Sequence, residues 1–260
     1  MKDVNYSKIF IKYEKDPLRK KGIEESLVRV LRENCSKEEP FRIIDIGCGT
    51  GNWLNTNFNN LSYCKNIEWF GLDISKGMLS LAGEKNSDFN LVLASADTLP
   101  FFDNSFNFII NEFTYHHFKN KEKPFGEHYR VMRKKGNLII RNIVPWEMSD
   151  WSLYYFFPTT GELDRKRFLR TEPLISILSN TGFKNININI NTMHGNEYKT
   201  VDRWVEIMNN RTHSELRIIS DKEYFEGMKK IKDMFINNRK ELGKILNNSI
   251  TTIFELQARK

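Results

Sequence analysis

The sequence is poor in cysteine and proline and has no long apolar run. It contains three cysteines and seven prolines in 260 residues. An odd number of cysteines without a C-x-x-C pair supports neither a disulfide framework nor a zinc knuckle, so a reducing cytoplasm fits best. No stretch reaches the roughly 18 apolar residues of a spanning helix, and the amino-terminal segment lacks an uncharged apolar core. We therefore expect a cytoplasmic protein that is neither exported nor anchored in a membrane.

The sequence also lacks any run of five or six like charges. Forty Lys and Arg residues against 33 Asp and Glu residues give a net charge of +7. This mild excess permits nucleic acid or an acidic substrate as a partner but demands neither. A content of 40% hydrophobic and 13% aromatic residues argues against disorder. A folded chain of this length buries roughly 75% of its unfolded surface, so a full core needs no covalent staples.

Short apolar runs alternate with helical patterns through the first 145 residues, and this rhythm predicts βαβ units around a parallel sheet. The predicted strands cover residues 41–46, 67–72, 89–93, 106–110 and 137–144. The predicted helices cover residues 22–34, 51–60, 75–86 and 121–135, with Ser75 as an N-cap. A helix over 172–181, ended by Gly182, and two late strands at 184–192 and 249–257 follow an aromatic stretch over 145–158. Between these late strands, helical patterns at 200–209 and 221–238 predict an inserted cap.

A glycine-rich motif, D-I-G-C-G-T-G over residues 45–51, stands where the first predicted strand ends and a helix begins. Glycines at alternate positions let the backbone turn sharply and approach a ligand closely, and N–H groups at a helix start attract negative charge. The dinucleotide fingerprint G-x-G-x-x-G fails, because its last glycine falls on Asn52 or Leu54. No G-K-[ST] follows, so a P-loop is excluded as well.

This motif resembles motif I of the class I S-adenosylmethionine-dependent methyltransferases, and later residues extend the resemblance. The segments L-D-I-S with Asp73 and A-D-T-L-P-F with Asp97 are similar to those that follow the family's second and third strands. F-N-F-I-I-N-E-F-T-Y-H-H-F is similar to its fourth strand and following loop. E-H-Y-R-V-M-R-K-K-G is similar to E-x-x-R-V-L-K-P-G-G, although Lys134 and Lys135 replace the proline and the first glycine. The ordered match covers roughly residues 41 to 144.

The resemblance implies a binding site for S-adenosylmethionine and its product S-adenosylhomocysteine. Asp73 is expected to accept the ribose hydroxyls and Asp97 the adenine amino group, while Tyr13 and Arg19 belong to a segment that folds over the cofactor. Cys48 is expected to fill space rather than to act as a nucleophile. The implied cofactor-binding residues are Tyr13, Arg19, Asp45, Gly47, Cys48, Gly49, Gly51, Asp73, Ile74, Met78, Ala96, Asp97, Thr98, Asn111 and Glu112.

Two adjacent histidines, His116 and His117, follow the fourth predicted strand, in the loop that lines the acceptor pocket of this family. A histidine there can take a proton from an acceptor hydroxyl or amine, because its side chain titrates near neutral pH. The alternative is that one ring packs in the loop and the other is solvated, since methyl transfer can proceed by positioning alone. No pattern of metal ligands surrounds the remaining histidines.

The resemblance also implies the fold and the domain layout. We expect an α/β fold with a doubly wound, seven-stranded, mostly parallel sheet, a Rossmann-like methyltransferase fold whose last strand is antiparallel, with a helical cap insertion. The expected domains are an amino-terminal helical segment over the cofactor at 1–40, the methyltransferase domain at 41–192 and 249–260, and the cap at 193–248. The aromatic stretch can wall an acceptor pocket or pack the cap onto the sheet.

The leading functional hypothesis is transfer of a methyl group to an O, N or C nucleophile of a small-molecule metabolite. Methylation of RNA or protein is the second hypothesis, and a non-catalytic protein that binds S-adenosylmethionine is the third. Against base methylation, the fourth strand ends in N-E-F-T rather than [DN]-P-P-[YF], and no nucleic-acid-binding domain is visible. The sequence does not identify the acceptor or the oligomeric state.

Overall fold

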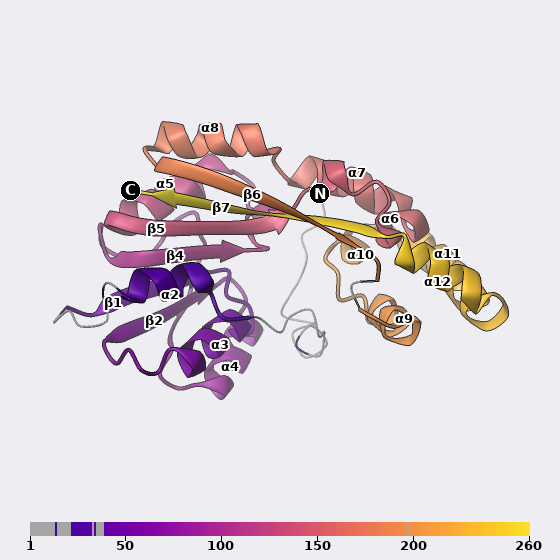
Figure 1. The fold of residues 1–260 in the computed structure, drawn as a ribbon, viewed down its shortest axis with the longest axis horizontal. Coiled ribbons are helices and arrows are strands. Elements are labelled where there is room, and N and C mark those ends of the chain that lie inside the picture. Colours follow the sequence, from indigo (N-terminus) through magenta and orange to yellow (C-terminus); the bar gives the residue numbers. More distant parts are fainter. Residues whose placement is uncertain (1–13, 15–21, 33, 35–38, 197) are drawn as a thin grey trace.

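The computed structural model describes residue 14 and the ranges 22–32, 34, 39–196 and 198–260. Figure 1 shows an α/β core at one end of the molecule and a group of helices at the other. The arrowheads of strands β4 (Phe106–Glu112) and β5 (Met132–Ile143) point toward these helices. The carboxyl edge of the parallel sheet, where ligands bind in open α/β folds, therefore faces the helical end.

The sheet has seven strands in the order β3-β2-β1-β4-β5-β7-β6. The neighbouring strands from β3 to β5 are parallel, whereas β7 is antiparallel to both β5 and β6. This arrangement confirms the predicted seven-stranded, mostly parallel sheet with an antiparallel last strand. The other strands are β1 (Phe41–Ile46), β2 (Ile67–Asp73), β3 (Asn90–Leu93), β6 (Lys184–His194) and β7 (Ile250–Arg259).

Two hydrophobic clusters cover the two faces of this sheet, as a doubly wound fold requires. Ile43 packs in one cluster and its neighbour Ile44 in the other, because successive side chains of a strand point to opposite faces. The Ile43 cluster includes residues of α2 (Glu25–Arg32), α3 (Asn52–Asn60) and α4 (Lys76–Lys85). The Ile44 cluster includes residues of α5 (Glu122–Val131) and α8 (Thr171–Thr181).

Local sequence signals set several of the helix ends. The Ser75 hydroxyl accepts a hydrogen bond from the Met78 N–H at the start of α4. Gly182 ends α8 in the left-handed region with φ 114°. Both predicted caps are thus confirmed. The predicted helix over 121–135 was too long, because α5 ends at Val131 and the chain continues directly as β5. Met132 is fully buried and pairs with Phe106 of β4, so tertiary packing overrides the local helical pattern.

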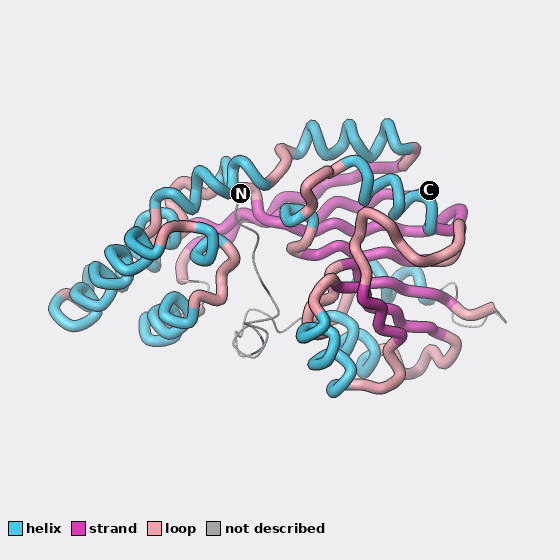
Figure 2. The backbone as a smooth tube through the Cα atoms, turned by 180° about the vertical axis from the view of Figure 1, so that it is seen from behind, coloured by secondary structure: helices cyan, strands magenta, loops and turns pink. Residues whose placement is uncertain are grey.

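The helical end forms its own hydrophobic cluster from two separate segments of the chain. Figure 2 shows its helices gathered at one end of the molecule, beyond the sheet. The first segment contains η4 (Pro145–Glu147), α6 (Ser152–Phe156) and α7 (Pro158–Arg167). The second contains α9 (Val201–Asn210), α10 (Glu215–Ile218), α11 (Asp221–Asn237) and α12 (Arg239–Asn247). Most of the large side chains in the aromatic stretch are buried in this cluster, including Trp151, Tyr154, Phe156 and Phe157. We call these two segments together the cap.

Two features bear on the expectations about cysteine and membranes. Cys48 is a buried free thiol, but Cys64 is disulfide-bonded, which the cysteine count did not predict. Within the described ranges, no helix is long and apolar enough to cross a membrane.

Candidate active site

A cavity of about 410 Å³ lies beside the glycine-rich motif. Among the residues predicted for the site, those that line it are Gly47, Gly49, Asp73, Ile74, Met78, Ala96, Asp97 and His117. Further lining residues, which the sequence did not single out, are Leu72, Ala94, Ser95, Phe113, Thr114, Phe118 and Lys119. Most of them flank a predicted residue directly, so proximity to the strand ends was the signal that could have found them.

The three glycines of the motif have different surroundings, although all have positive φ. A Cβ on Gly47 would lie 2.2 Å from Thr114 Cγ2, and one on Gly51 would lie 2.9 Å from Ala82 Cβ. A Cβ on Gly49 would meet no described atom within 4 Å. Gly47 and Gly51 thus allow close packing within the protein, whereas Gly49 leaves open space beside the cavity that a ligand can approach.

Asp73 at the end of β2 connects the glycine loop to the next helix. Its Oδ2 accepts a hydrogen bond from the Gly49 N–H at 2.9 Å, and its Oδ1 accepts one from the Ser75 N–H at 2.8 Å. Burial raises the pKa of this carboxyl group, and the backbone hydrogen bonds from Ser75, Gly49 and Ile74 oppose that rise. The carboxylate is therefore fixed in orientation on the wall of the cavity.

Asp97 has an oxygen that lacks a hydrogen-bond donor among the described residues. Its Oδ2 accepts from the Ser95 hydroxyl at 3.4 Å, whereas its Oδ1 is buried and has no partner. A buried carboxylate oxygen without a donor is costly, so a ligand that supplies an N–H or O–H would be stabilised there. Asp97 and the space at Gly49 therefore fit a ligand that supplies a hydrogen-bond donor and approaches the glycine loop closely.

The remaining predicted cofactor residues within the described ranges do not line this cavity. Tyr13 and Arg19 lie outside the described residues. Asn111 is fully buried, where its Nδ2 donates to the Ile46 carbonyl and its Oδ1 accepts from the Tyr115 N–H. It thereby holds the loop that follows β4. The Thr98 N–H donates to the Ser95 carbonyl in the turn that carries Asp97.

Cys48 and Asp45, which both belong to the glycine-rich motif, are buried. Burial raises the pKa of the Cys48 thiol well above its ordinary value, and the charges of Asp45 and Asp73 raise it further. A thiol held in its protonated form is a poor nucleophile, which agrees with the predicted role of a space-filling residue.

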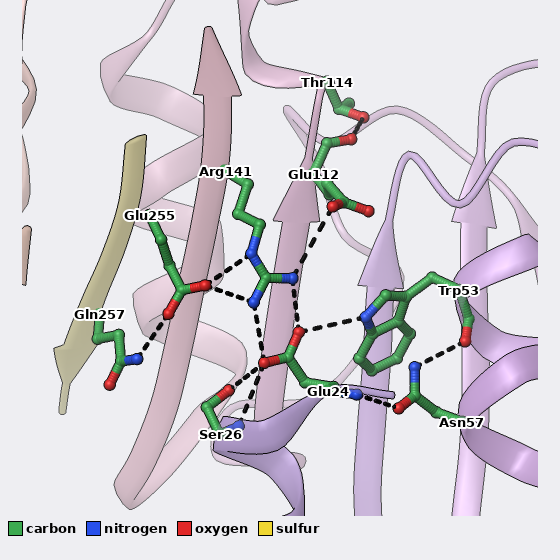
Figure 3. Close-up of polar contacts among 9 residues, drawn as sticks. All are labelled: Glu24, Ser26, Trp53, Asn57, Glu112, Thr114, Arg141, Glu255 and Gln257. Carbon is green, nitrogen blue, oxygen red and sulfur yellow. Dashed lines mark hydrogen bonds and ion pairs between the residues drawn. The ribbon is translucent and has the colours of Figure 1, made fainter. Parts of the chain in front are cut away.

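Glu112 lines a second cavity of about 280 Å³ instead. Figure 3 shows Arg141 of β5 at the centre of three carboxylates there. Its guanidinium donates to Glu24 at 2.6 and 2.9 Å and to Glu255 of β7 at 2.7 Å, and its Nη1 lies 3.8 Å from Glu112 Oε1. Burial opposes ionisation of Glu24, but Arg141 holds the pKa of Glu24 below its ordinary value. This cluster ties the start of α2 to the sheet.

The two histidines that follow β4 have different environments. His117 lines the first cavity, whereas His116 is buried. The His116 ring stacks on Phe168 with a centroid distance of 4.5 Å and an interplanar angle of 11°, and its Nδ1 lies 3.2 Å from Asn142 Nδ2. The structure therefore places only His117 where it can meet a ligand in the cavity.

A buried ionic cluster in the cap adjoins these histidines. Arg167 of α7 donates to Asp164 at 2.6 Å and to Glu215 of α10 at 3.2 Å. Burial opposes ionisation of Glu215, but Arg167, His213 and His117 hold the pKa of Glu215 below its ordinary value. In contrast, burial and the nearby Glu215 charge raise the pKa of Asp164. The charged groups of the cap thus interact electrostatically with His117, which lines the first cavity.

No group of three or more His, Cys, Asp or Glu side chains suited to a metal ion occurs in the part of the chain that the structure describes. The fold, the glycine loop and the two strand-end carboxylates are similar to those of S-adenosylmethionine-dependent methyltransferases. Residues 44–140 match the family model described as "Methyltransferase domain".

Two curated methyltransferases are similar in sequence to part of this chain. The chain is 30% identical over 147 residues to demethylmenaquinone methyltransferase of Thermotoga maritima, a match that spans 52% of this chain and 63% of that protein. It is 26% identical over 171 residues to the ubiquinone/menaquinone biosynthesis C-methyltransferase UbiE of Campylobacter jejuni, which spans 56% and 72% of the two chains. The chain therefore matches less than two thirds of the length of the first of these relatives.

Two solved structures share the fold over most of this chain. An Anabaena variabilis protein assigned to an antibiotic biosynthesis pathway as a methyltransferase has a TM-score of 0.68 at 17% identity, over 91% of this chain and 98% of that one. Phosphoethanolamine N-methyltransferase 2 of Haemonchus contortus, in complex with S-adenosyl-L-methionine, has a TM-score of 0.57 at 20% identity, over 98% of this chain and 57% of that one.

Proposed function

We propose that this protein transfers a methyl group from S-adenosylmethionine to an O, N or C nucleophile of a small molecule that binds between the carboxyl edge of the sheet and the cap. The observation that carries the proposal is the cavity itself, in which Asp73, Asp97 and the open space at Gly49 meet. The position of the cap beyond this edge supports a small acceptor, since a cap restricts access and excludes water.

The relatives do not supply the acceptor. The named quinone methyltransferases match about half of this chain, and the family match ends at residue 140, before the cap begins. Residues of the cap and of the loop after β4 would contact an acceptor; the loop lies inside that match, but the cap lies outside it. A quinone-like ring therefore remains one candidate among small molecules.

The proposed roles follow from the geometry of the chain. Asp73 would accept the ribose hydroxyls, because a carboxylate offers two oxygens that only accept hydrogen bonds. Asp97 Oδ1 would accept from the adenine amino group, which removes the cost of an unpaired buried oxygen. The bound cofactor supplies an electrophilic methyl group on a sulfonium. His117 would take the proton from an acceptor hydroxyl or amine, and the closed cap would exclude water during transfer.

Calorimetry with S-adenosylhomocysteine tests the cofactor site. Asp73→Ala should lose about 1.5 to 3 kcal/mol of binding free energy, the value of hydrogen bonds to a charged group. Asp103→Ala removes an exposed carboxylate that pairs with Arg130 outside the cavity, and it should bind like the wild type. Equal affinity of folded Asp73→Ala and wild type would refute the ribose assignment. Radiolabelled cofactor with a metabolite library then tests methyl transfer.

A further inference from the structure

The paired histidines after β4 are held in different chemical states by a residue from another strand. We propose that Asn142 of β5 fixes His116 as a neutral imidazole with its proton on Nε2, so that His117 titrates beside the cavity without competition from its neighbour. Asn142 is then a positioning residue that acts through His116. The catalytic consequence rests on the proposed function, whereas the state of His116 does not.

The orientation of the Asn142 amide carries the argument. Asn142 is fully buried, and its Oδ1 accepts a hydrogen bond from the Ile143 N–H at 3.1 Å. Its Nδ2 therefore faces His116 Nδ1, 3.2 Å away. An amide nitrogen only donates hydrogen bonds, so Nδ1 must be the acceptor and must be unprotonated. A neutral imidazole carries one proton, which then lies on Nε2.

The surroundings of His116 also disfavour its charged form. A proton on Nδ1 of His116 would point at the Nδ2–H group of Asn142. The two donors would repel each other, and the hydrogen bond from Asn142 would be lost. The ring is buried and stacks on Phe168, and the Arg167 guanidinium lies 5.7 Å from the centroid of the same phenyl ring. Burial destabilises an imidazolium ion, and Arg167 is itself paired with Asp164 and Glu215. Hydrogen bonding and burial thus favour the same neutral state.

The charged groups around His117 differ from those around His116. Lys119, Asp73 and Asp97 line the same cavity, and the buried carboxylate of Glu215 interacts electrostatically with His117 from the cap. The carboxylates outnumber the one lysine in this set, so they favour the protonated form of His117. The environment separates the two rings, although they are adjacent in the sequence.

The short distance between the rings makes this separation necessary. Their centroids lie 3.9 Å apart, where two imidazolium ions would repel each other and titrate as a coupled pair. With His116 held neutral, His117 can take the proton of an acceptor X–H group. The X–C bond forms as the carbon–sulfur bond breaks, the electron pair of that bond stays on sulfur, and the proton ends on His117.

Nitrogen NMR of histidine-labelled protein tests the state of His116 without an acceptor. In the wild type, His116 should show the shifts of a neutral Nε2–H imidazole from about pH 5.5 to 8.5, and its signal is assigned by its loss in His116→Phe. In Asn142→Asp, the carboxylate accepts from Nδ1, so Nδ1 should gain a proton and His116 should titrate within this range. Asn142→Ser removes the fixed amide donor without adding a buried charge, because a hydroxyl can donate or accept, so both protonation sites of His116 become accessible.

Asn57→Asp is the matched control. Asn57 is also fully buried, and it bonds to the Trp53 carbonyl and the Glu24 N–H on the opposite face of the sheet. This variant should leave the His116 signal unchanged. A wild-type His116 that is charged or protonated on Nδ1 would overturn the inference. It would also be overturned if His116 stayed a neutral Nε2–H imidazole in both Asn142 variants.

The pH dependence of S-adenosylhomocysteine binding tests the consequence for His117. Affinity should change roughly 3- to 10-fold between pH 5.5 and 8.5 along a single titration in wild type and in His116→Phe, and this change should disappear in His117→Gln. Asn142→Asp should give a broader, two-step curve. A two-step curve in the wild type would contradict the inference. Absence of binding at every pH would instead refute the proposed function, while the NMR result still decides the state of His116.

Discussion

Replacing Gly49 by alanine separates the role of the glycine loop in cofactor binding from its role in folding. Gly49 has φ 53°, so alanine there must adopt the left-handed region, which costs about 1 to 2 kcal/mol. The new Cβ meets no described atom within 4 Å, so no steric cost within the protein adds to this. At about 2 to 4 °C per kcal/mol, Tm should fall by roughly 2 to 8 °C. The same Cβ points into the space that the cofactor needs, and we expect S-adenosylhomocysteine affinity to fall at least about 100-fold.

Gly51→Ala is the matched comparison, because it imposes the same kind of backbone cost in the same loop. Gly51 has φ 72°, and its Cβ would lie 2.9 Å from Ala82 Cβ of α4, inside the normal contact distance. Overpacking adds about 1 to 3 kcal/mol, so this variant should lose more stability than Gly49→Ala. Its folded fraction should lose less cofactor affinity. Thermal unfolding and calorimetry measure both quantities on each variant.

The order of the two effects decides whether the reasoning is correct. Gly49→Ala should be the more stable variant and the weaker binder. If folded Gly49→Ala bound S-adenosylhomocysteine as tightly as the wild type, the backbone at Gly49 would not contact the cofactor. If Gly49→Ala were instead the less stable variant, the open space beside it would be filled by the protein, and the cavity would not extend to the glycine loop.

Three further predictions concern stability and the cap. Burial lowers the pKa of His128 from 6.5 to about 4, so the free energy of unfolding should fall by up to about 3 kcal/mol as pH falls from about 6.5 to 4, with no contribution above this range. Urea titrations at pH 7 and pH 5 should show this dependence in the wild type and not in His128→Leu. An equal pH effect in both proteins would contradict the assignment. Arg141→Met should lower the free energy of unfolding by about 3 to 5 kcal/mol because buried Glu24 loses its partner, and adding Glu24→Gln should recover part of that loss. If the losses of the two substitutions were additive, the pair would not be coupled. Hydrogen exchange in α9 to α12 should slow more with S-adenosylhomocysteine and an acceptor together than with S-adenosylhomocysteine alone, and exchange unchanged by either would indicate a structural cap.

Local sequence patterns predicted the core of the fold and the positions of its strand-end carboxylates. β1 runs from Phe41 to Ile46 as predicted, and β2 ends at Asp73. These features depend on apolar runs and on rules for glycine and strand ends, which act over a few residues. Asp73, Asp97 and Gly49 meet in one cavity because parallel strands bring their carboxyl ends to the same edge.

Only the tertiary structure decided how chemically similar neighbours differ. The sequence treats His116 and His117 alike, but Asn142 from β5 and Phe168, which follows α7, enclose the first, while the second lines the cavity. Glu112 likewise lies beside Arg141 rather than in the cofactor cavity, because β5 runs parallel to β4 and places the two residues opposite each other. Such contacts join residues far apart in the chain, and their identity depends on strand order, register and burial, which no local pattern encodes.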